Sequence, residues 1–180
     1  MIEIHPFGIF VPKNTQYLLL GSFTGVIKNA SYNWFYSNGR NQFWPIMEKV
    51  YQTDLNTKTQ QQQLFTNLKM AITDIILSCC RKANNNLDSS LINPVFNTQA
   101  ILKVIWENNI KTIYFSSRFT EKLFKKRFIE VIQKHPTIKF ITLPSPSPRY
   151  AAMSKLTKIV QYKKLLPKLF DKKHQQKSTN

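Results

Sequence analysis

The chain has 180 residues, and 26 Lys and Arg against 9 Asp and Glu give a formal net charge of +17. This length accommodates one domain with a sizeable hydrophobic core and is too short for two domains of ordinary size. No apolar run approaches the length of a membrane-spanning helix, and the N-terminus lacks the pattern of a signal peptide, so we expect an intracellular protein. The positive charge predicts a polyanionic partner, with nucleic acid first and an anionic membrane surface second. The alternative is a lysine-rich surface without a specific partner.

The first half of the chain begins with a lead-in segment and a buried strand. Residues 1–14 place Pro6, Gly8 and Pro12 among apolar residues, which predicts an ordered segment on the core and no helix. Residues 17–22 form a near-continuous apolar run, as expected of a strand that is buried on both faces. Helices are predicted over 43–51 and 64–70, and the apolar residues 71–77 are compatible with a strand or a helix.

The second half alternates helices and strands. A helix is predicted over 97–108, because Thr98 can cap it and apolar residues recur on one face. The other predicted elements are strands over 112–115 and 138–143 and helices over 118–134 and 155–170. This alternation predicts an α/β fold with three layers, α/β/α, around a central, mostly parallel four-stranded sheet. Residues 1–170 would form this single domain, and residues 171–180 a polar, basic C-terminal tail.

Cysteine and histidine offer little chemistry in this sequence. Cys79 and Cys80 are adjacent, and a disulfide between neighbours is strained, so we expect two reduced thiols. No further cysteine or suitably spaced histidine pair completes a metal site. None of the histidines is expected to be catalytic: His5 has no evident partner, His135 precedes a proline and His174 lies in the tail.

A glycine loop and an aromatic segment follow the first strand. The apolar run breaks at Gly21 into the small-residue loop Gly-Ser-Phe-Thr, and ligands of open parallel sheets bind where such strands end. Residues 36–44 then combine aromatic rings, amides and an arginine just before a helix. Rings that stack and amides that form hydrogen bonds suit a planar, polar ligand such as a nucleobase.

A second loop follows the last predicted strand. Residues 144–150 read Pro-Ser-Pro-Ser-Pro-Arg-Tyr, and three alternate prolines restrict the backbone strongly. A loop held rigid before binding loses little entropy when it meets a partner. Its hydroxyls and its arginine suit phosphate oxygens, and rigid apolar wedges can part stacked bases. The alternative is a proline-rich connection without a binding role.

These segments, in this order, resemble motifs of the uracil-DNA glycosylase superfamily. The resemblance is closest to its hypoxanthine-DNA glycosylase branch and the mismatch-specific (G:T/U) relatives. Residues 18–25 and 36–44 resemble the first motif, residues 74–79 and 87–90 the middle segment, and residues 143–148 the late Leu-Pro-Ser-Thr-Ser-Pro loop. The resemblance spans about residues 15–165 and implies the α/β/α fold of that superfamily.

The resemblance implies a monofunctional DNA glycosylase of base excision repair. Such an enzyme flips a deaminated base, uracil or hypoxanthine, out of the duplex and hydrolyses its N-glycosidic bond. It implies no cofactor and no metal ion. The expected partner is a damaged or mismatched DNA duplex and not a membrane, and we expect a monomer that associates with the nucleoid.

The resemblance also implies roles for individual residues. Asn41 aligns with the catalytic asparagine, whose amide can orient a water and bind the base edge; the alternative is a helix N-cap. Tyr36 aligns with the aromatic residue that stacks on the flipped base; the alternative is a core aromatic. The residues implied to line the base pocket with Tyr36 are Gly21, Ser22, Phe23 and Ser116.

DNA contacts are implied for the late loop and are compatible with two basic helices. The loop residues expected to contact DNA are Ser145, Pro146, Ser147, Pro148, Arg149 and Tyr150. Basic residues that could bind phosphates are Arg118, Lys122, Lys125, Lys126 and Arg127 on one predicted helix and Lys155, Lys158, Lys163, Lys164 and Lys168 on the last one.

The sequence departs from the family pattern at the base pocket. Ser116 stands where relatives carry an asparagine that reads the base edge, and a hydroxyl offers fewer hydrogen bonds than an amide. Phe23 stands where other branches place a catalytic Asp or Asn, in agreement with the apolar residue of the hypoxanthine branch. The second hypothesis is therefore a catalytically inactive, glycosylase-like protein that binds nucleic acid or a nucleotide. A metal-dependent nuclease is not expected, because the carboxylates are scattered along the chain.

Overall fold

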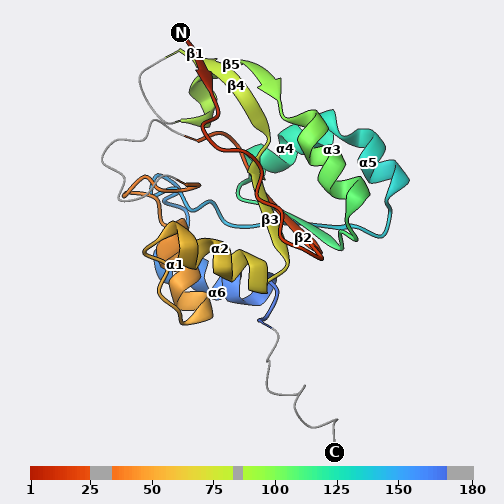
Figure 1. The fold of residues 1–180 in the computed structure, drawn as a ribbon. Helices are drawn as coiled ribbons and strands as arrows, with labels where there is room; N and C mark the ends of the chain where they lie inside the picture. Colours follow the sequence, from red (N-terminus) through yellow and green to blue (C-terminus); the bar gives the residue numbers. More distant parts are fainter. Residues whose placement is uncertain (25–33, 83–86, 170–180) are drawn as a thin grey trace, which may run out of the picture.

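A four-stranded parallel sheet lies at the centre of the fold (Figure 1). The computed structural model describes residues 1–24, 34–82 and 87–169. The strands of this sheet are β2 (Tyr17–Gly21), β3 (Met70–Asp74), β6 (Thr112–Phe115) and β7 (Lys139–Thr142), in the spatial order β3-β2-β6-β7. Every neighbouring pair is parallel, so the predicted mostly parallel, four-stranded sheet is confirmed.

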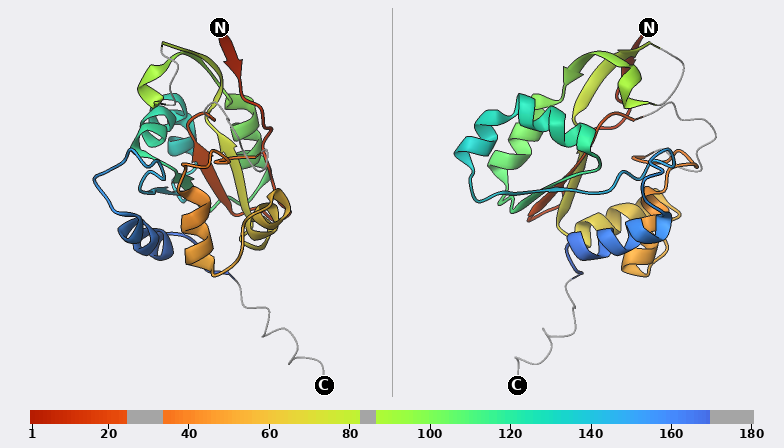
Figure 2. Two further views of the ribbon diagram at one scale, coloured as in Figure 1. Left: turned by 90° about the vertical axis from the view of Figure 1, so that its left-hand side faces the viewer. Right: turned by 180° about the vertical axis from the view of Figure 1, so that it is seen from behind.

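Helices cover both faces of this sheet, which confirms the three-layer α/β/α prediction (Figures 1 and 2). Alternate side chains of each strand enter two hydrophobic cores, one on either face. Leu19, Ile72 and Tyr114 belong to one core, and Leu18, Ala71 and Ile113 to the other. The first core is closed by α1 (Phe43–Tyr51), α2 (Lys58–Asn67) and α6 (Lys155–Leu165), the second by α3 (Thr98–Glu107), α4 (Arg118–Arg127) and α5 (Ile129–Lys134).

A second, antiparallel sheet was not predicted. It consists of β1 (Ile2–Ile4), β4 (Ile76–Arg81) and β5 (Leu91–Phe96), in the order β1-β4-β5, with the short 3-10 helix η1 (Asp88–Ser90) before β5. The ambiguous residues 71–77 are strand on both sides of Ile75, which separates β3 of the first sheet from β4 of the second. The backbone of Ile75 donates to the carbonyl of Gly21 and accepts from Asn97, and so fixes this crossing.

Several helix boundaries differ from the predictions for local reasons. The helix predicted over 64–70 is α2, which starts earlier because Thr57 and Gln60 form a capping box. The helix predicted over 118–134 is interrupted at Phe128, whose φ of −118° and ψ of 36° are not helical. The helix predicted from residue 155 to residue 170 ends at Leu165. The N-cap of α3 is Asn97 rather than Thr98, and it makes no side-chain capping bond.

The remaining general predictions have mixed outcomes. Cys79 and Cys80 are free thiols, as expected. In the part of the chain that is described, no helix has both the length and the hydropathy to cross a membrane. The predicted tail, residues 171–180, lies outside the described residues.

Candidate functional site

The carboxyl ends of β2, β3 and β6 meet at one edge of the parallel sheet. Gly21 ends β2, Asp74 ends β3, and Ser116 follows β6 and donates its N–H to the carbonyl of Leu20. A Cβ atom on Gly21 would lie 2.0 Å from Oδ1 of Asp74 and 2.8 Å from the hydroxyl of Tyr36. Glycine is therefore required here, because the carboxylate occupies the space that a side chain would need.

His5 joins this edge from the N-terminal segment, and the prediction that it has no partner was wrong. Its Nε2 lies 2.8 Å from Oδ2 of Asp74 and 3.0 Å from Oγ1 of Thr24, and Thr24 donates to the same Oδ2 at 3.1 Å. Nδ1 lies 2.8 Å from the carbonyl oxygen of Phe7. A nucleophilic triad places its acid and its hydroxyl on opposite ring nitrogens. Here both contact Nε2, so the arrangement orients side chains and does not activate Thr24.

The protonation of His5 follows from these contacts. Burial disfavours the charged imidazolium, but the hydrogen bond to Asp74, its negative charge and the carbonyl of Phe7 outweigh this cost and raise the pKa of His5. In the imidazolium, Nε2–H donates to Asp74 and Nδ1–H to the carbonyl of Phe7; in the neutral tautomer with the proton on Nε2, Nδ1 instead accepts the backbone N–H of Phe7, 3.1 Å away. When His5 is protonated, its positive charge lies 2.8 Å from the carboxylate of Asp74, next to Gly21.

Tyr36 connects this edge with the start of α1. Its ring is stacked on Phe43 with centroids 4.2 Å apart and planes inclined by 25°, so one face of the ring is already covered. Its backbone has a φ of 57°, an uncommon value for a tyrosine. Its hydroxyl is buried and has no hydrogen-bond partner among the described residues. Burial and the nearby charge of Asp74 raise the pKa of Tyr36 well above its usual value, so the phenol stays neutral.

These features refine the two alternatives for Tyr36. The packing on Phe43 gives it the role of a core aromatic on one face. The residue remains partly exposed, and stacking of a base on its other face stays a prediction.

Asn41 lies where the chain enters α1, and its side chain supports the helix start. Its Oδ1 accepts the backbone N–H of Phe43 at 2.9 Å, a turn bond just before the helix, while the N-cap position itself is held by Gln42, so the expectation of Asn41 as the N-cap was wrong. The amide nitrogen of Asn41 makes no hydrogen bond within the described parts of the chain. Among the described residues, Asn41 thus has a bound acceptor oxygen and an unbonded donor, so its support of the helix start is compatible with the predicted catalytic role.

The proline-rich loop packs against the corner formed by Asn41 and Gln42. Gln42 donates its backbone N–H to the carbonyl of Pro146 at 3.0 Å, and Tyr162 of α6 donates its hydroxyl to the carbonyl of Pro144 at 2.9 Å. Within the loop, the hydroxyl oxygens of Ser145 and Ser147 accept backbone N–H groups at 3.3 Å each. Each serine therefore keeps its O–H to donate, for example to a phosphate oxygen. Pro148 and Arg149 are exposed.

The other residues predicted for the base pocket have defined partners. The hydroxyl of Ser22 donates to Oδ1 of Asp88 at 2.7 Å, so it is not free for a ligand. Burial, together with the charge of Asp74, raises the pKa of Asp88 despite this bond and nearby Arg81. The ring of Phe23 packs edge-on against His5, with centroids 5.7 Å apart, and lies 5.5 Å from the guanidinium carbon of Arg81.

The structure thus brings the predicted site residues together in two neighbouring groups. Gly21, Asp74 and Ser116 lie around the Tyr36 hydroxyl, and Asn41 lies beside the proline-rich loop. The stacked rings of Tyr36 and Phe43 join the groups. Sequence reasoning missed the roles of His5 and Asp74. The contact between His5 and Asp74 depends on the pairing of strands in the second sheet, and no local sequence pattern predicts that pairing.

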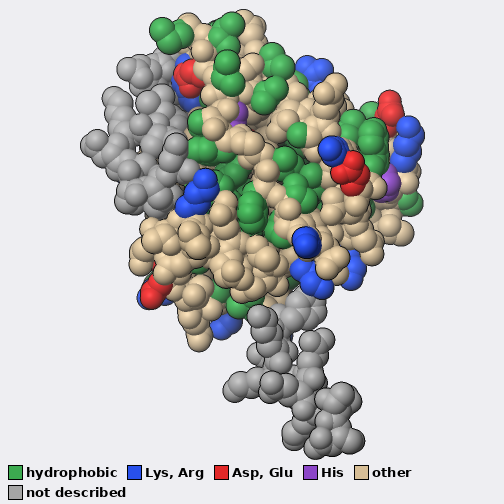
Figure 3. All heavy atoms as spheres, viewed as in Figure 1, with side chains coloured by type: hydrophobic (Ala, Val, Ile, Leu, Met, Phe, Trp, Pro, Cys, Tyr) green, Lys and Arg blue, Asp and Glu red, His purple; other side chains and the backbone are tan. Residues whose placement is uncertain are grey.

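Basic side chains do not form a single patch on the face seen in Figure 3. Lysine and arginine side chains lie there at several separate places. The basic residues of α4 are exposed, and Lys125 pairs with Glu121 at 2.7 Å. Lys158 departs from the prediction that it is a surface residue: it is 1% exposed. Its place four residues before buried Tyr162 is the signal that could have revealed this.

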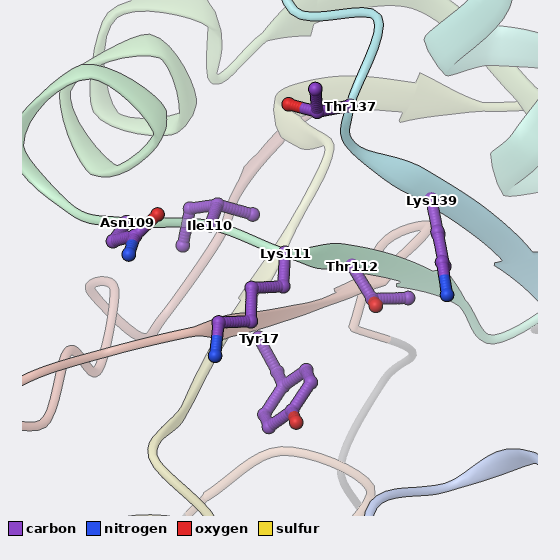
Figure 4. Close-up of a pocket in the computed structure, with 7 residues that line it drawn as sticks. All are labelled: Tyr17, Asn109, Ile110, Lys111, Thr112, Thr137 and Lys139. Carbon is purple, nitrogen blue, oxygen red and sulfur yellow. The ribbon is translucent and has the colours of Figure 1, made fainter.

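No cluster of three or more potential metal ligands occurs within residues 1–24, 34–82 and 87–169. A hollow of about 440 Å³ lies at the opposite, amino edge of the sheet, where Tyr17, Thr112 and Lys139 begin their strands (Figure 4). None of the predicted site residues lines it. It is therefore separate from the candidate site.

Comparison with known structures supports the fold. A solution NMR structure of a protein described as a putative uracil DNA glycosylase, from Methanosarcina acetivorans, matches with a TM-score of 0.66. The sequences are 18% identical, and the match covers 92% of this chain and 96% of that chain. No protein-family model and no curated protein matches the sequence. At this identity the likeness establishes a shared uracil-DNA-glycosylase-like fold.

Proposed function

We propose that this protein is a DNA glycosylase that hydrolyses the N-glycosidic bond of a flipped, deaminated base, uracil or hypoxanthine. The observation that carries the proposal is the position of Asn41. Its amide nitrogen makes no hydrogen bond to any described residue, its oxygen is held by the Phe43 N–H at 2.9 Å, and its neighbour Gln42 is bonded to the proline-rich loop at 3.0 Å. A donor that is fixed in space beside a proline-rich loop with exposed Pro148 and Arg149 suits the recognition of a base leaving a duplex.

The proposed reaction breaks the bond between the sugar C1′ and the base nitrogen, and the bonding electron pair leaves with the base. The transition state is oxocarbenium-like, as in glycoside hydrolysis. Water attacks C1′ and loses a proton to solvent, and the departing base takes up a proton. Asn41 cannot act as a base, so its role is to donate a hydrogen bond to the base edge or to orient the water.

Substrate binding in this proposal uses the two groups of residues described above. The free face of Tyr36 would stack on the base, a contact worth about 1–3 kcal/mol per base. Gly21, Ser22 and Phe23 would bring backbone close to it. The exposed Arg149 and the serine hydroxyls of the late loop would bind phosphates, with Pro148 available to part the stacked bases. The partner is then a damaged or mismatched duplex inside the cell, bound by a monomer.

The test uses end-labelled duplexes that contain uracil, hypoxanthine, xanthine or a G·T mismatch. Strand scission by alkali after incubation with the purified protein reports abasic sites. Asn41→Ala should lower the single-turnover rate by at least tenfold, equivalent to about 1.4 kcal/mol of barrier. Asn41→Ser is the matched control, because serine keeps an acceptor for the Phe43 N–H but loses the amide donor. If both variants lose the same factor in the single-turnover rate, the effect comes from the amide donor of Asn41. If both variants keep the wild-type rate, Asn41 has no role in catalysis.

A second candidate function is nucleic-acid or nucleotide binding without chemistry. It is favoured by Ser116, which offers a hydroxyl at the base pocket where relatives carry an amide, and by the engagement of the Ser22 hydroxyl with Asp88. It expects salt-sensitive retention of the same duplexes with no abasic product from any lesion. Scission at a single lesion would decide against it.

A further inference from the structure

Lys158 of α6 is a buried cation that no carboxylate accompanies in the described parts of the chain. Its Nζ donates to Oε1 of Gln42 and to the carbonyl oxygen of Ser147, both at 3.1 Å. The ring of Tyr150 lies 5.5 Å from the same nitrogen. All three partners are neutral, and two of them belong to the proline-rich loop.

Such a residue carries an energetic cost that an apolar side chain would avoid. A buried charge is tolerated only when it is well solvated by the protein, and neutral oxygens solvate an ammonium less well than a carboxylate does. Burial accordingly lowers the pKa of Lys158. Tyr162, one turn further along, is the other buried residue of α6. A buried lysine without a carboxylate partner is expected mainly at places where function requires a particular geometry.

The geometry that Lys158 maintains is the contact between the loop and the start of α1. Gln42 is linked to the loop in two ways. Its backbone N–H donates directly to Pro146, and its side chain accepts from Lys158, which also donates to Ser147 of the loop. One helical turn further along, Tyr162 holds Pro144. Asn41 directly precedes Gln42 and shares its corner. Removing the ammonium group would leave two of these carbonyl groups without their donor.

We propose that Lys158 is a positioning residue that fixes residues 144–150 against Asn41 and Gln42, so that the loop and Asn41 meet a duplex as one rigid unit. The inference rests on the proposed function for the roles of the loop and of Asn41. It assigns Lys158 no contact with phosphate, in contrast to the exposed lysines of the same helix.

The experiment compares Lys158→Met with Lys155→Met, an exposed lysine on the first turn of α6. The first readout is amide hydrogen exchange at Gln42, whose N–H is bonded to Pro146. We expect exchange at least tenfold faster in Lys158→Met and unchanged in Lys155→Met. The second readout is the dissociation constant for an undamaged duplex over a range of salt. Lys158→Met should bind at least fivefold more weakly at each salt concentration, with an unchanged slope of log K against log salt.

Two results would overturn the proposal. A folded Lys158→Met with wild-type exchange at Gln42 and wild-type affinity would show that the ammonium positions nothing. A salt slope reduced by about 0.9 would make Lys158 a phosphate contact. If Lys158→Met does not fold, Gln42→Leu carries the same expectations, because it removes the side-chain acceptor and keeps the backbone N–H. A protein that releases no base from any lesion refutes the proposed function, while the exchange and affinity readouts still decide on Lys158.

Discussion

His5 and Asp74, 69 positions apart in the sequence, form a buried pair in which Nε2 lies 2.8 Å from Oδ2, an ion pair when His5 is protonated. The pair joins the N-terminal segment to the carboxyl end of β3. It also explains why Gly21 has no space for a side chain, since the other carboxylate oxygen lies against it. The carboxylate of Asp74 therefore determines how the N-terminal segment, the end of β2 and the end of β3 pack together.

The first prediction concerns the pH dependence of stability. The pKa of His5 is raised in the folded chain above its ordinary value of 6.5, so the folded state binds this proton more tightly than the unfolded state. The stabilisation is complete below pH 6.5 and is lost as the pH rises through the higher, folded pKa. The free energy of unfolding, measured with urea, should therefore decrease over this interval. His5→Phe should abolish the decrease, and a wild-type profile that is flat there would contradict the prediction.

The second prediction concerns Gly21. In Gly21→Ala the new methyl group overlaps Oδ1 of Asp74, whose position is fixed by His5 and Thr24. We expect a loss of about 1–3 kcal/mol in the free energy of unfolding. Gly39→Ala is the control, because a Cβ there has no atom within 4 Å and should change stability by less than about 0.5 kcal/mol. Equal stability of the two variants would show that the carboxylate moves aside without cost.

The third prediction concerns the hydroxyl of Tyr36. This buried group has no well-aligned hydrogen-bond partner among the described residues, although the nearby Ser116 side chain acts to lower its pKa, so Tyr36→Phe removes a polar atom and at most a weak interaction with Ser116. Urea unfolding should show equal or higher stability than the wild type. The variant also retains the ring, so duplex binding should persist in Tyr36→Phe and weaken in Tyr36→Leu if the free face stacks on a base. A clear loss of stability in Tyr36→Phe would reveal a partner for the hydroxyl.

The fourth prediction concerns Arg149 in the late loop. Its side chain is exposed and, in the proposed function, binds a phosphate. Arg149→Ala should lower the salt dependence of duplex affinity by about 0.9 in the log–log slope. Lys134→Ala, an exposed lysine of α5 paired with Glu130 at 3.1 Å, serves as the comparison and should leave the slope unchanged. The reverse pattern would place the DNA on the α5 side of the molecule.

The central sheet could be predicted because its signals are local. Residues 18–20 form an apolar run that ends at Gly21, and this pattern alone indicates a buried strand and the loop after it. The family resemblance implied separate roles for Asn41 and the late loop from the order of their motifs, and the structure adds a bond between the loop and Gln42, the neighbour of Asn41. These features require only neighbouring residues or motif order.

The features that sequence reasoning missed depend on distant pairing. The second sheet unites strands from residues 2–4, 76–81 and 91–96, and without it His5 has no reason to meet Asp74. From the sequence, Lys158 is grouped with the surface lysines because lysines are numerous in this chain and are usually exposed. A lysine is seldom buried, so its place on the same face as Tyr162 carried little weight.

The inward bonding of the late loop has an electrostatic consequence. Three of its carbonyl oxygens, those of Pro144, Pro146 and Ser147, accept hydrogen bonds from Gln42 just before α1 and from two residues of α6. Their negative dipole ends therefore point into the protein, away from the side on which Pro148 and Arg149 are exposed. A polyanion that approaches from that side meets hydroxyl hydrogens and a guanidinium group without the repulsion of these peptide oxygens.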